Sequence, residues 1–483
     1  MNNKRKKVRI GIVVSACILL GFLFLLVEGK KPFKKTELSV YDLEEESIQT
    51  DEESGKGYVD NILLAYFSEE SSEKDKEFIV EHLNGEIAGR IDAINQLQIR
   101  IPSMTKEELE NTCKETMEAD CVEYCAYDTV YDSNIIDTIP KDQWDYFDAS
   151  WDPSHFSRQN WGLMAIDAPK AWTLNQNNKG TVIGIVDSGI DIDHEDLKGR
   201  IDFPSREAEF FNTPSDHGTH IAGIIGAIAN NQTGLTGMDW NSKIMAYDCF
   251  MDKEIVTGND IIAGIATLVE NGAKVINLSV GCSASALSNH FATIPEEDVD
   301  REAMDIAVPV SMMLASGYDF LLVQAAGNGA KDGIGVDAKY NGAFCAISSS
   351  NADNYFASSQ DLIDHIIIVG NAEPFENGYR QEISSNGGDR VSIFAPGTYI
   401  LSCVPNDLYA YMTGTSMAAP YVTASAAMVW SMNPEMSAIE VKRAICNPQN
   451  TKYAVLNNRD NASDGSGRLV NTYLAMQSVN SGE

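Results

Sequence analysis

The sequence lacks most features that would indicate a nucleic-acid partner, a metal centre or a cross-linked scaffold. It has only 36 Lys and Arg against 70 Asp and Glu, a formal net charge of −34 over 483 residues. A charge of this sign repels phosphate groups, so we expect no nucleic acid as a partner. The nine cysteines are an odd number without the spacing of zinc ligands or of a disulfide framework. There is also no internal repeat and no glycine-rich nucleotide-binding loop.

The most informative motif is a serine among small and apolar residues. Ser416 lies in the run GTSMAAP, and the following stretch to Trp430 is poor in charge and rich in alanine, which indicates a buried helix. Pro420 is compatible with that helix only near its start. Ser416 then lies at the helix N-terminus, where free N–H groups favour a developing negative charge. Such a hydroxyl suits nucleophilic attack if a base is near, and otherwise the motif is an ordinary helix cap.

Candidates for an acid and a base lie earlier in the chain. The apolar run from Thr181 to Val186 indicates a buried parallel strand, and Asp187 follows it, where open α/β sheets have their active sites. A turn aspartate is the alternative. His217 begins a helix of small residues, DHGTHIAGIIG. His220 would permit a metal pair, but no HExxH pattern is present, so we expect His220 to be structural.

A side-chain amide follows a further apolar strand. Residues 320–326 are continuous FLLVQAA, and Asn328 comes next in the run GNG. Asn-Gly is a turn signal, but the amide of Asn328 can also donate a hydrogen bond to an oxyanion.

Asp187, His217 and Ser416 occur in the order of the subtilisin triad. The segments VIGIVDSGID, DHGTHIAG, AAGNG and GTSMAAP resemble the four sequence signatures of the subtilisin-like serine peptidases, the subtilases. The resemblance implies an α/β fold of three layers with a mostly parallel central sheet, preceded by a small α+β pro-domain. It also implies a serine endopeptidase that acts on protein or peptide substrates through an acyl-enzyme and needs no cofactor for its chemistry.

The resemblance assigns a role to each motif. Asp187 orients His217, His217 takes the proton of Ser416, and Asn328 with the N–H of Ser416 stabilises the oxyanion. The strand that ends in Ser279, Val280 and Gly281 resembles the one that pairs with an extended substrate. Sheet core is the alternative for the first half of that strand.

Two alternatives to a general endopeptidase stay open. Insertions at about 282–298 and 340–364 are expected to flank the substrate cleft, which would suit a dedicated processing peptidase for one precursor. The other alternative is a catalytically silent peptide-binding protein with the same fold. All four catalytic positions carry the expected residues, which favours the enzyme.

A structural calcium site is a further expectation from the resemblance. Asp196 and Asn231, the latter in the loop ANNQTGL, occupy places similar to those of calcium ligands in relatives. Their carboxylate and amide oxygens are ligands that Ca²⁺ accepts, and an ordinary polar loop is the alternative.

The N-terminus indicates export. Basic residues precede an apolar run at 10–27, which as a helix would be about 27 Å long, enough to span a bilayer core. We expect an uncleaved anchor in the cell membrane, with the catalytic domain on the extracytoplasmic side. A cleaved signal peptide with a secreted enzyme, and a lipid-modified Cys17, are the alternatives.

The sequence between the anchor and the catalytic domain indicates three further segments. We expect a signal anchor at 1–30, an acidic linker at 31–57 and a pro-domain at 58–132 with βαββαβ order. A linker with the maturation site follows at 133–158, and the catalytic domain is expected at 159–478. The pro-domain would be an intramolecular inhibitor and folding aid that is removed by self-cleavage. An unrelated accessory domain is the alternative.

Overall fold

The computed structural model describes most of the chain from Leu38 onwards. The described residues are 38–51, 57–68, 70–132, 161–174, 179–205, 208–209, 212–229, 231, 233–251, 255–281, 286–348, 359–375, 378–451, 454–456 and 467–480. The expected anchor at 10–27 and the expected maturation linker at 133–158 lie outside these residues. Within the described ranges, no helix is both long and apolar enough to cross a membrane.

A central sheet of ten strands carries the larger part of the chain, and its order is β19-β18-β14-β13-β12-β11-β7-β9-β8 with β15 beside β13. From β13 to β8 all neighbouring strands are parallel. The strands are β7 (Val182–Asp187), β8 (Ile201–Asp202), β9 (Lys243–Asp248), β11 (Val275–Leu278), β12 (Leu321–Ala325), β13 (Ile366–Phe375), β14 (Gly378–Gln381), β15 (Ile393–Pro396), β18 (Ala454–Leu456) and β19 (Gly467–Arg468).

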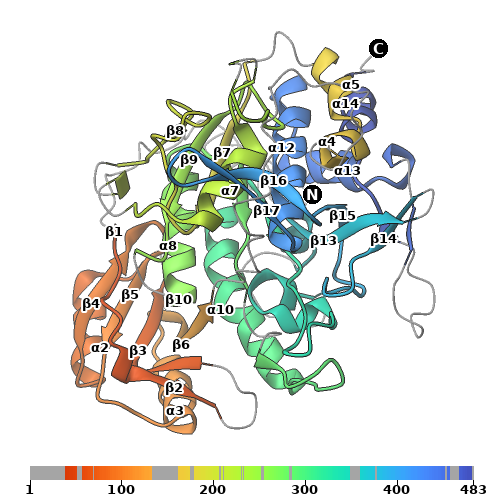
Figure 1. The fold of residues 1–483 in the computed structure, drawn as a ribbon. Helices are drawn as coiled ribbons and strands as arrows, with labels where there is room; N and C mark the ends of the chain where they lie inside the picture. Colours follow the sequence, from red (N-terminus) through yellow and green to blue (C-terminus); the bar gives the residue numbers. More distant parts are fainter. Residues whose placement is uncertain are drawn as a thin grey trace, which may run out of the picture. The chain divides into compact units, whose positions relative to one another are not determined.

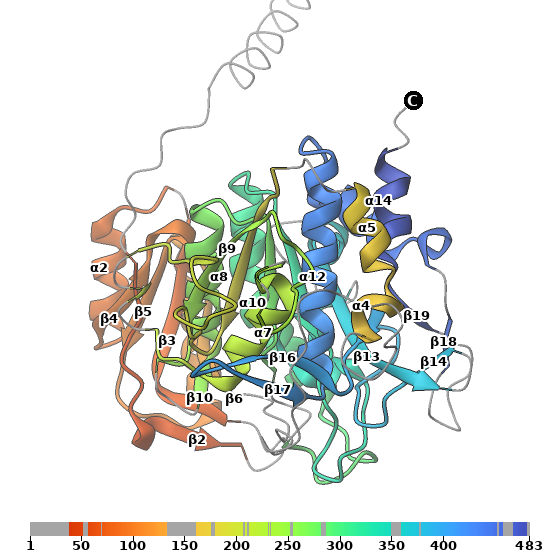
Figure 2. The same ribbon diagram turned by 45° about the horizontal axis from the view of Figure 1, so that its top comes forward.

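Helices cover both faces of this sheet (Figures 1 and 2). Alternate strand residues enter different hydrophobic clusters: Val275 and Val323 belong to one, whereas Ile276 and Leu322 belong to the other. On the first side lie α4 (Trp161–Ala165), α5 (Ala168–Leu174), α7 (Asp216–Gly226), α12 (Thr415–Met432), α13 (Ala438–Cys446) and α14 (Thr472–Asn480). On the second lie α8 (Gly258–Glu270), α10 (Glu296–Ala315) and α11 (Ser359–Asp364). The expected three-layer α/β fold is confirmed.

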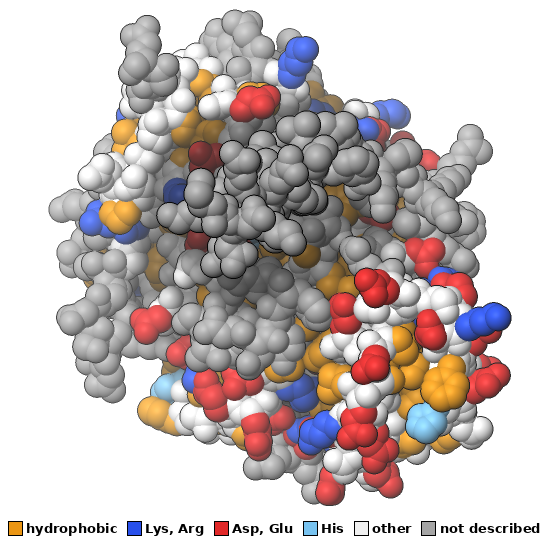
Figure 3. All heavy atoms as spheres, turned by 180° about the vertical axis from the view of Figure 1, so that it is seen from behind, with side chains coloured by type: hydrophobic (Ala, Val, Ile, Leu, Met, Phe, Trp, Pro, Cys, Tyr) orange, Lys and Arg blue, Asp and Glu red, His pale blue; other side chains and the backbone are white. Residues whose placement is uncertain are grey.

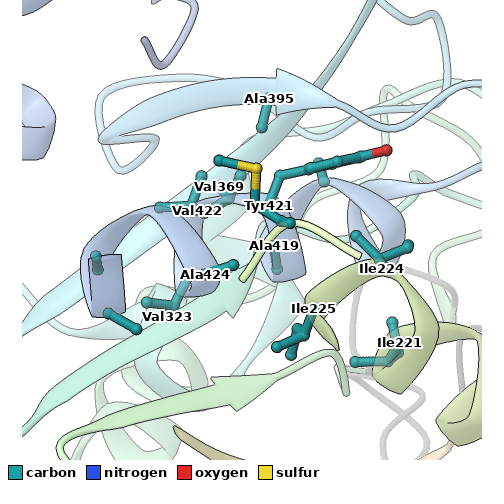
Figure 4. Packing of buried hydrophobic residues seen from close by; sticks show 14 of the residues in the cluster. Ile221, Ile224, Ile225, Val323, Val369, Ala395, Ala419, Tyr421, Val422 and Ala424 are labelled. Carbon is teal, nitrogen blue, oxygen red and sulfur yellow. The ribbon is translucent and has the colours of Figure 1, made fainter. Parts of the chain in front are cut away.

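Helix α12 is the centre of the first layer, since its side chains are buried from Thr415 to Ser431. A helix that is apolar on every side is stable only inside a core. In Figure 4, Ala419, Val422 and Ala424 of α12 pack among Val323 and Val369 of the sheet and Ile221, Ile224 and Ile225 of α7. The hairpin of β16 (Ile400–Val404) and β17 (Leu408–Met412) packs against α7.

A second sheet precedes the larger one in the chain. It has the expected βαββαβ order, with η2 (Asp92–Ile94) between β4 and β5. The elements are β3 (Gly57–Phe67), α2 (Glu73–His82), β4 (Glu86–Ile91), β5 (Gln96–Arg100), α3 (Lys106–Thr116) and β6 (Val122–Asp132). Both helices begin with a capping box, Ser72 with Asp75 and Thr105 with Glu108. They cover one face of the sheet, while Ile62, Leu64 and Tyr124 on the other face join the hydrophobic cluster of α8 and α10.

Residues 38–51 correct the expectation of a linker. This segment forms β1 (Leu38–Ser39), η1 (Glu45–Ser47) and β2 (Ile48–Thr50), and β1 and β2 pair with β4 and β3. Tyr41 between them is 3% exposed, and its hydroxyl donates to Asp128 Oδ2 over 2.8 Å. The acidic composition of the segment concealed a few apolar residues that anchor it.

The larger part of the chain also contributes a strand to the second sheet. Strand β10 (Ile255–Thr257) pairs antiparallel with the end of β6 and leads directly into α8. The expected insertion at 282–298 leads into α10, and the one at 340–364 begins within the 3-10 helix η4 (Ala338–Asn341) and contains η5 (Ala343–Ala346) and α11. Acidic side chains are spread over the described part of the face in Figure 3, as the net charge requires.

Candidate active site

Asp187 and His217 lie side by side at the carboxyl end of the central sheet. Asp187 is the last residue of β7 and His217 is in the first turn of α7. His217 Nδ1 is 2.7 Å from Asp187 Oδ1, and both side chains are buried. Because the carboxylate can only accept, Nδ1 carries the proton. His217 Nε2 is buried without a hydrogen-bond partner, so it is the free acceptor of the pair.

Three small residues hold this pair in place, and the sequence reasoning did not single them out. Ser188 donates to Asp187 Oδ1 through its N–H (2.8 Å) and its hydroxyl (3.1 Å). The Ser188 hydroxyl also contacts Ser215 Oγ (2.7 Å) and accepts from Gly218 N (3.1 Å). A Cβ at Gly218 would lie 2.1 Å from Ser188 O, so only glycine permits this approach. The signal was present in the run DSG and in the serine before DHG.

The surroundings of His217 favour its protonated form. Burial alone would lower the pKa of His217, but the charge of Asp187 and the hydrogen bond to it outweigh burial and raise the pKa. A histidine with a raised pKa is a stronger proton acceptor. The geometry therefore suits His217 as a general base.

Ser416 is the second residue of α12, and α12 packs against α7. In this structure the Ser416 hydroxyl donates to Ser279 O over 3.2 Å rather than to His217. Ser279 Oγ donates in return to Ser416 O over 3.0 Å.

Asn328 lies between the end of β12 and the start of α12. Its Oδ1 accepts from Thr415 N (2.8 Å) and from Thr415 Oγ1 (3.1 Å). These bonds fix the orientation of the amide, and its Nδ2 is left as a buried donor without a partner. Asn386, a residue that the sequence reasoning missed, holds the same loop: it accepts from Gly329 N (3.0 Å) and donates to Ala326 O (2.9 Å).

The expected substrate strand lies next to the nucleophile. Ser279 follows β11 and contacts Ser416 through the two reciprocal bonds. The Val280 side chain is buried in the core, and Val280 O accepts from Gln324 Nε2 over 3.3 Å. A Cβ at Gly281 would lie 2.3 Å from the Asn341 amide. Main-chain atoms rather than side chains of this segment are therefore suited to pair with a peptide.

The ring nitrogen Nε2 of His220 lies near two backbone carbonyl oxygens, which is the arrangement of a structural histidine. This nitrogen lies 3.0 Å from Ile400 O and 2.9 Å from Ala410 O, so it joins α7 to the β16–β17 hairpin. Burial lowers the pKa of His220 to about 3, which keeps the ring neutral. These contacts agree with the expected structural role.

Asp196 and Asn231 are close together, but their contacts do not form a cation site. Asp196 Oδ1 accepts from Asn231 Nδ2 (2.7 Å), and Oδ2 accepts from Leu235 N (2.8 Å). The Asn231 oxygen is turned to Thr233 N (3.0 Å). Across the described ranges, no cluster of three His, Cys, Asp or Glu side chains could hold a metal. As arranged here, N–H donors occupy the oxygens that Ca²⁺ would need.

Comparison with known proteins agrees with the fold. Residues 178–467 match the model of the peptidase S8 or subtilase family. This match covers more than half of the chain, which therefore belongs to the subtilase family of subtilisin-like serine endopeptidases.

Among its relatives is a thermophilic serine proteinase of Bacillus sp. strain AK1, 30% identical over 305 residues, which are 62% of this chain and 64% of the relative. The chain thus covers less than two thirds of that relative. Thermitase of Thermoactinomyces vulgaris is 29% identical over 335 residues, 67% of this chain and 98% of thermitase. Fervidolysin of Fervidobacterium pennivorans, a keratinolytic enzyme related to subtilisin, matches 92% of this chain and 65% of its own with a TM-score of 0.61 and 20% identity. That likeness shows the fold.

The contacts of Asp196 predict that the loop at 231–235 does not depend on calcium. We expect EDTA to leave the Tm of the full chain unchanged, because backbone and amide N–H groups already satisfy the carboxylate. Asp196→Ala should lower stability by about 1–3 kcal/mol with or without calcium, since it leaves these donors unpaired. Thermal unfolding in EDTA and in excess CaCl₂ measures both effects. A large, calcium-dependent rise in Tm that Asp196→Ala abolishes would instead establish the site.

Proposed function

We propose that the chain cleaves peptide bonds through Asp187, His217 and Ser416, with Asn328 as an oxyanion donor. The observation that carries the proposal is a pair of free groups, one in the first turn of α7 and one in the loop bonded to the start of α12. His217 Nε2 and Asn328 Nδ2 are both buried and unpartnered, and each is fixed by a bond to its opposite atom. Buried polar groups are normally paired, so these two unpaired groups support a role in binding a substrate.

The reaction begins when the peptide displaces the resting hydroxyl. An N–H group of the substrate donates to Ser279 O in place of the Ser416 hydroxyl, and Ser416 Oγ is then free to donate to His217 Nε2. Nε2 accepts the hydroxyl proton as Oγ bonds to the scissile carbonyl carbon, and the negative oxygen lies between Asn328 Nδ2 and the N-terminus of α12. His217 then gives the proton to the leaving amine as the C–N bond breaks. Water hydrolyses the acyl-enzyme by the same route.

The second sheet is proposed to be a pro-domain that restrains the enzyme until self-cleavage within 133–158. Its support is the shared interface: Asp128 Oδ1 accepts from Asn259 N at the start of α8 (3.2 Å), and Tyr124 donates to Asp305 of α10 (3.0 Å). Gln96 also donates to Asn259 Oδ1 (2.9 Å). These polar contacts lie beside apolar contacts of Ile62 and Leu64, and a mixed interface of this kind can separate in water, which suits a removable inhibitor.

Export and a membrane anchor at 10–27 are proposed from the sequence alone. This location would place the enzyme outside the cytoplasm. The pro-domain lies between the anchor and the proposed cut within 133–158, so it would stay attached to the membrane after cleavage. A cleaved signal peptide would give a secreted enzyme with the same chemistry. Mass analysis of the N-terminus of membrane and culture fractions separates the two locations.

Maturation should depend on Ser416. We expect the full chain to lose its N-terminal part by a cut near 133–158, while the Ser416→Ala variant stays intact, because the hydroxyl is the nucleophile. Intact mass measures the cut, and labelling by a fluorophosphonate reports the active serine. Ser425→Ala, a buried hydroxyl on the same helix, is the matched control and should mature normally. Cleavage of the Ser416→Ala chain at the same rate would show that another protease makes the cut.

The labelling rate should rise with pH as His217 loses its proton. Since the pKa of His217 is raised above 6.5, the midpoint should lie above 6.5, and the rate should be low below it. Asp187→Asn should cut the maximal rate by about 10⁴ and lower the midpoint, because the charge that raises the pKa is gone. Rates of fluorophosphonate labelling from pH 5 to 9 measure both. A profile that Asp187→Asn leaves unchanged would exclude His217 as the base.

The cleaved pro-domain should leave more readily as pH rises. Burial, and next the charge of Asp260, raise the pKa of Asp128 to about 7, whereas a solvated aspartate has a pKa near 3.9. A carboxyl with a raised pKa favours the bound state below its free pKa, and that contribution is lost as pH rises to about 7. We expect the dissociation constant to rise on the order of tenfold or more between pH 5 and 7. Gel filtration of matured, fluorophosphonate-blocked protein measures it.

Asp128→Asn is the control for this pH dependence. It keeps the shape of the side chain and removes the titration, so retention of the pro-domain should change much less with pH. An equal loss of the pro-domain with pH in both proteins would assign the effect to other groups of the interface.

A further inference from the structure

A chain of buried polar side chains joins the middle of α12 to the nucleophile through the sheet. Thr423 Oγ1 donates to Asn277 Oδ1 over 2.9 Å, and Asn277 Nδ2 donates to Ser279 Oγ over 3.0 Å. Ser279 Oγ donates in turn to Ser416 O over 3.0 Å. Thr423, Asn277 and Ser279 are each 0% exposed. The path leaves α12, crosses to β11 and returns to the first turn of α12.

Asn277 is out of place for a purely apolar core. It lies in the strand sequence VINL, between Ile276 and Leu278, in the interior of the parallel sheet. Burying an amide costs free energy unless both of its ends are paired. Here both ends are paired, and both partners belong to the segments that carry the reaction. A leucine at this position could make neither bond.

The geometry defines what is aligned. Ser416 and Thr423 are seven residues apart on α12, two turns along one face of the helix. The chain of hydrogen bonds thus joins β11 to α12 at two points, Asn277 to Thr423 and Ser279 to Ser416. Ser279 is the shared residue, because its hydroxyl holds Ser416 O while its carbonyl accepts the Ser416 hydroxyl. The carbonyl that would receive the substrate N–H is thereby held at a set distance from the nucleophile.

We propose that Asn277 and Thr423 are positioning residues for Ser416, which rests on the function proposed above for Ser416 and Ser279. They act through Ser279 and touch no substrate. Their bonds hold the substrate strand and the start of α12 in one register, so that the scissile carbonyl meets the hydroxyl and the oxyanion donors together. A misplacement of about 1 Å in such an alignment costs roughly 10²-fold in rate.

Thr423→Val is the sharpest test, because valine keeps the shape and removes only the donor to Asn277. In the matured full chain, we expect the maximal rate of fluorophosphonate labelling to fall by about ten- to a hundredfold. The probe concentration that gives half of the maximal rate should stay unchanged, because the probe contacts neither Thr423 nor Asn277 and the labelling rate reports only the placement of Ser416. Thr423→Ser restores the hydroxyl and should restore the rate to within about threefold of wild type.

Ser425→Ala is the matched control. Ser425 is also 0% exposed on α12, but its hydroxyl bonds to Tyr421 O and Thr472, away from the nucleophile. It should lower the Tm as Thr423→Val does and leave the labelling rate unchanged. If Thr423→Val does not fold, Asn277→Asp replaces it. Its carboxylate can only accept, so Ser279 must turn its hydroxyl away from Ser416 O, and the same fall in rate is expected.

The outcomes separate this inference from the proposed function. Wild-type labelling with an unchanged rate in Thr423→Val or Asn277→Asp overturns the positioning role and leaves the triad intact. A rate that falls equally in Ser425→Ala also overturns it, because general loosening of α12 then explains the effect. A wild type that neither matures nor labels overturns the proposed function first, and the inference with it.

Discussion

The complete burial of α12 is the constraint on which the rest of the structure depends. A helix without a polar face must have protein on every side, and here the sheet, α7 and the C-terminal helices supply it. This burial fixes the helix N-terminus to within the tolerance of core packing. Ser416 and the free N–H groups of the first turn of α12 are therefore held against the core, beside which α7 packs. The core and the site are consequences of the same packing.

The sequence predicted that Asp187, Asn328 and Ser416 lie at the ends of strands or at the start of a helix. It did not predict the contacts that hold these side chains. Apolar runs before Asp187 and Asn328, and the alanine-rich run after Ser416, identified strands and a buried helix because each has a strong local pattern. The contacts that hold these side chains come from residues without such a pattern. Ser188, Asn277 and Asn386 act across 30 to 146 residues of chain, as between Ser188 and Gly218 or Asn277 and Thr423. Only the tertiary fold reveals these partners.

The segment before the second sheet shows where composition misleads. Residues 38–51 are acidic, and average composition indicates a solvated linker. The fold uses Leu38, Tyr41 and Ile48 individually, through strand pairing and one buried hydroxyl. Main-chain pairing needs no sequence pattern, so two short strands can form where periodicity is too brief to detect. For the same reason β10 was not foreseen as a partner of β6.

The chemistry of the interface between the second sheet and the two helices follows from what a removable part requires. A purely apolar interface would be stable but could not separate without exposing a large hydrophobic surface. Here apolar contacts of Ile62 and Leu64 are combined with buried carboxyl groups of Asp128 and Asp305. Each carboxyl accepts a hydrogen bond across the closed interface, Asp128 from Asn259 N and Asp305 from Tyr124, and regains hydration when the interface opens. Burial raises the pKa of both groups, so their proton uptake opposes separation in acid and their ionisation favours it near neutrality. Asp128 and Asp305 thus help to hold the interface closed, and their ionisation near neutral pH makes the closed interface less stable.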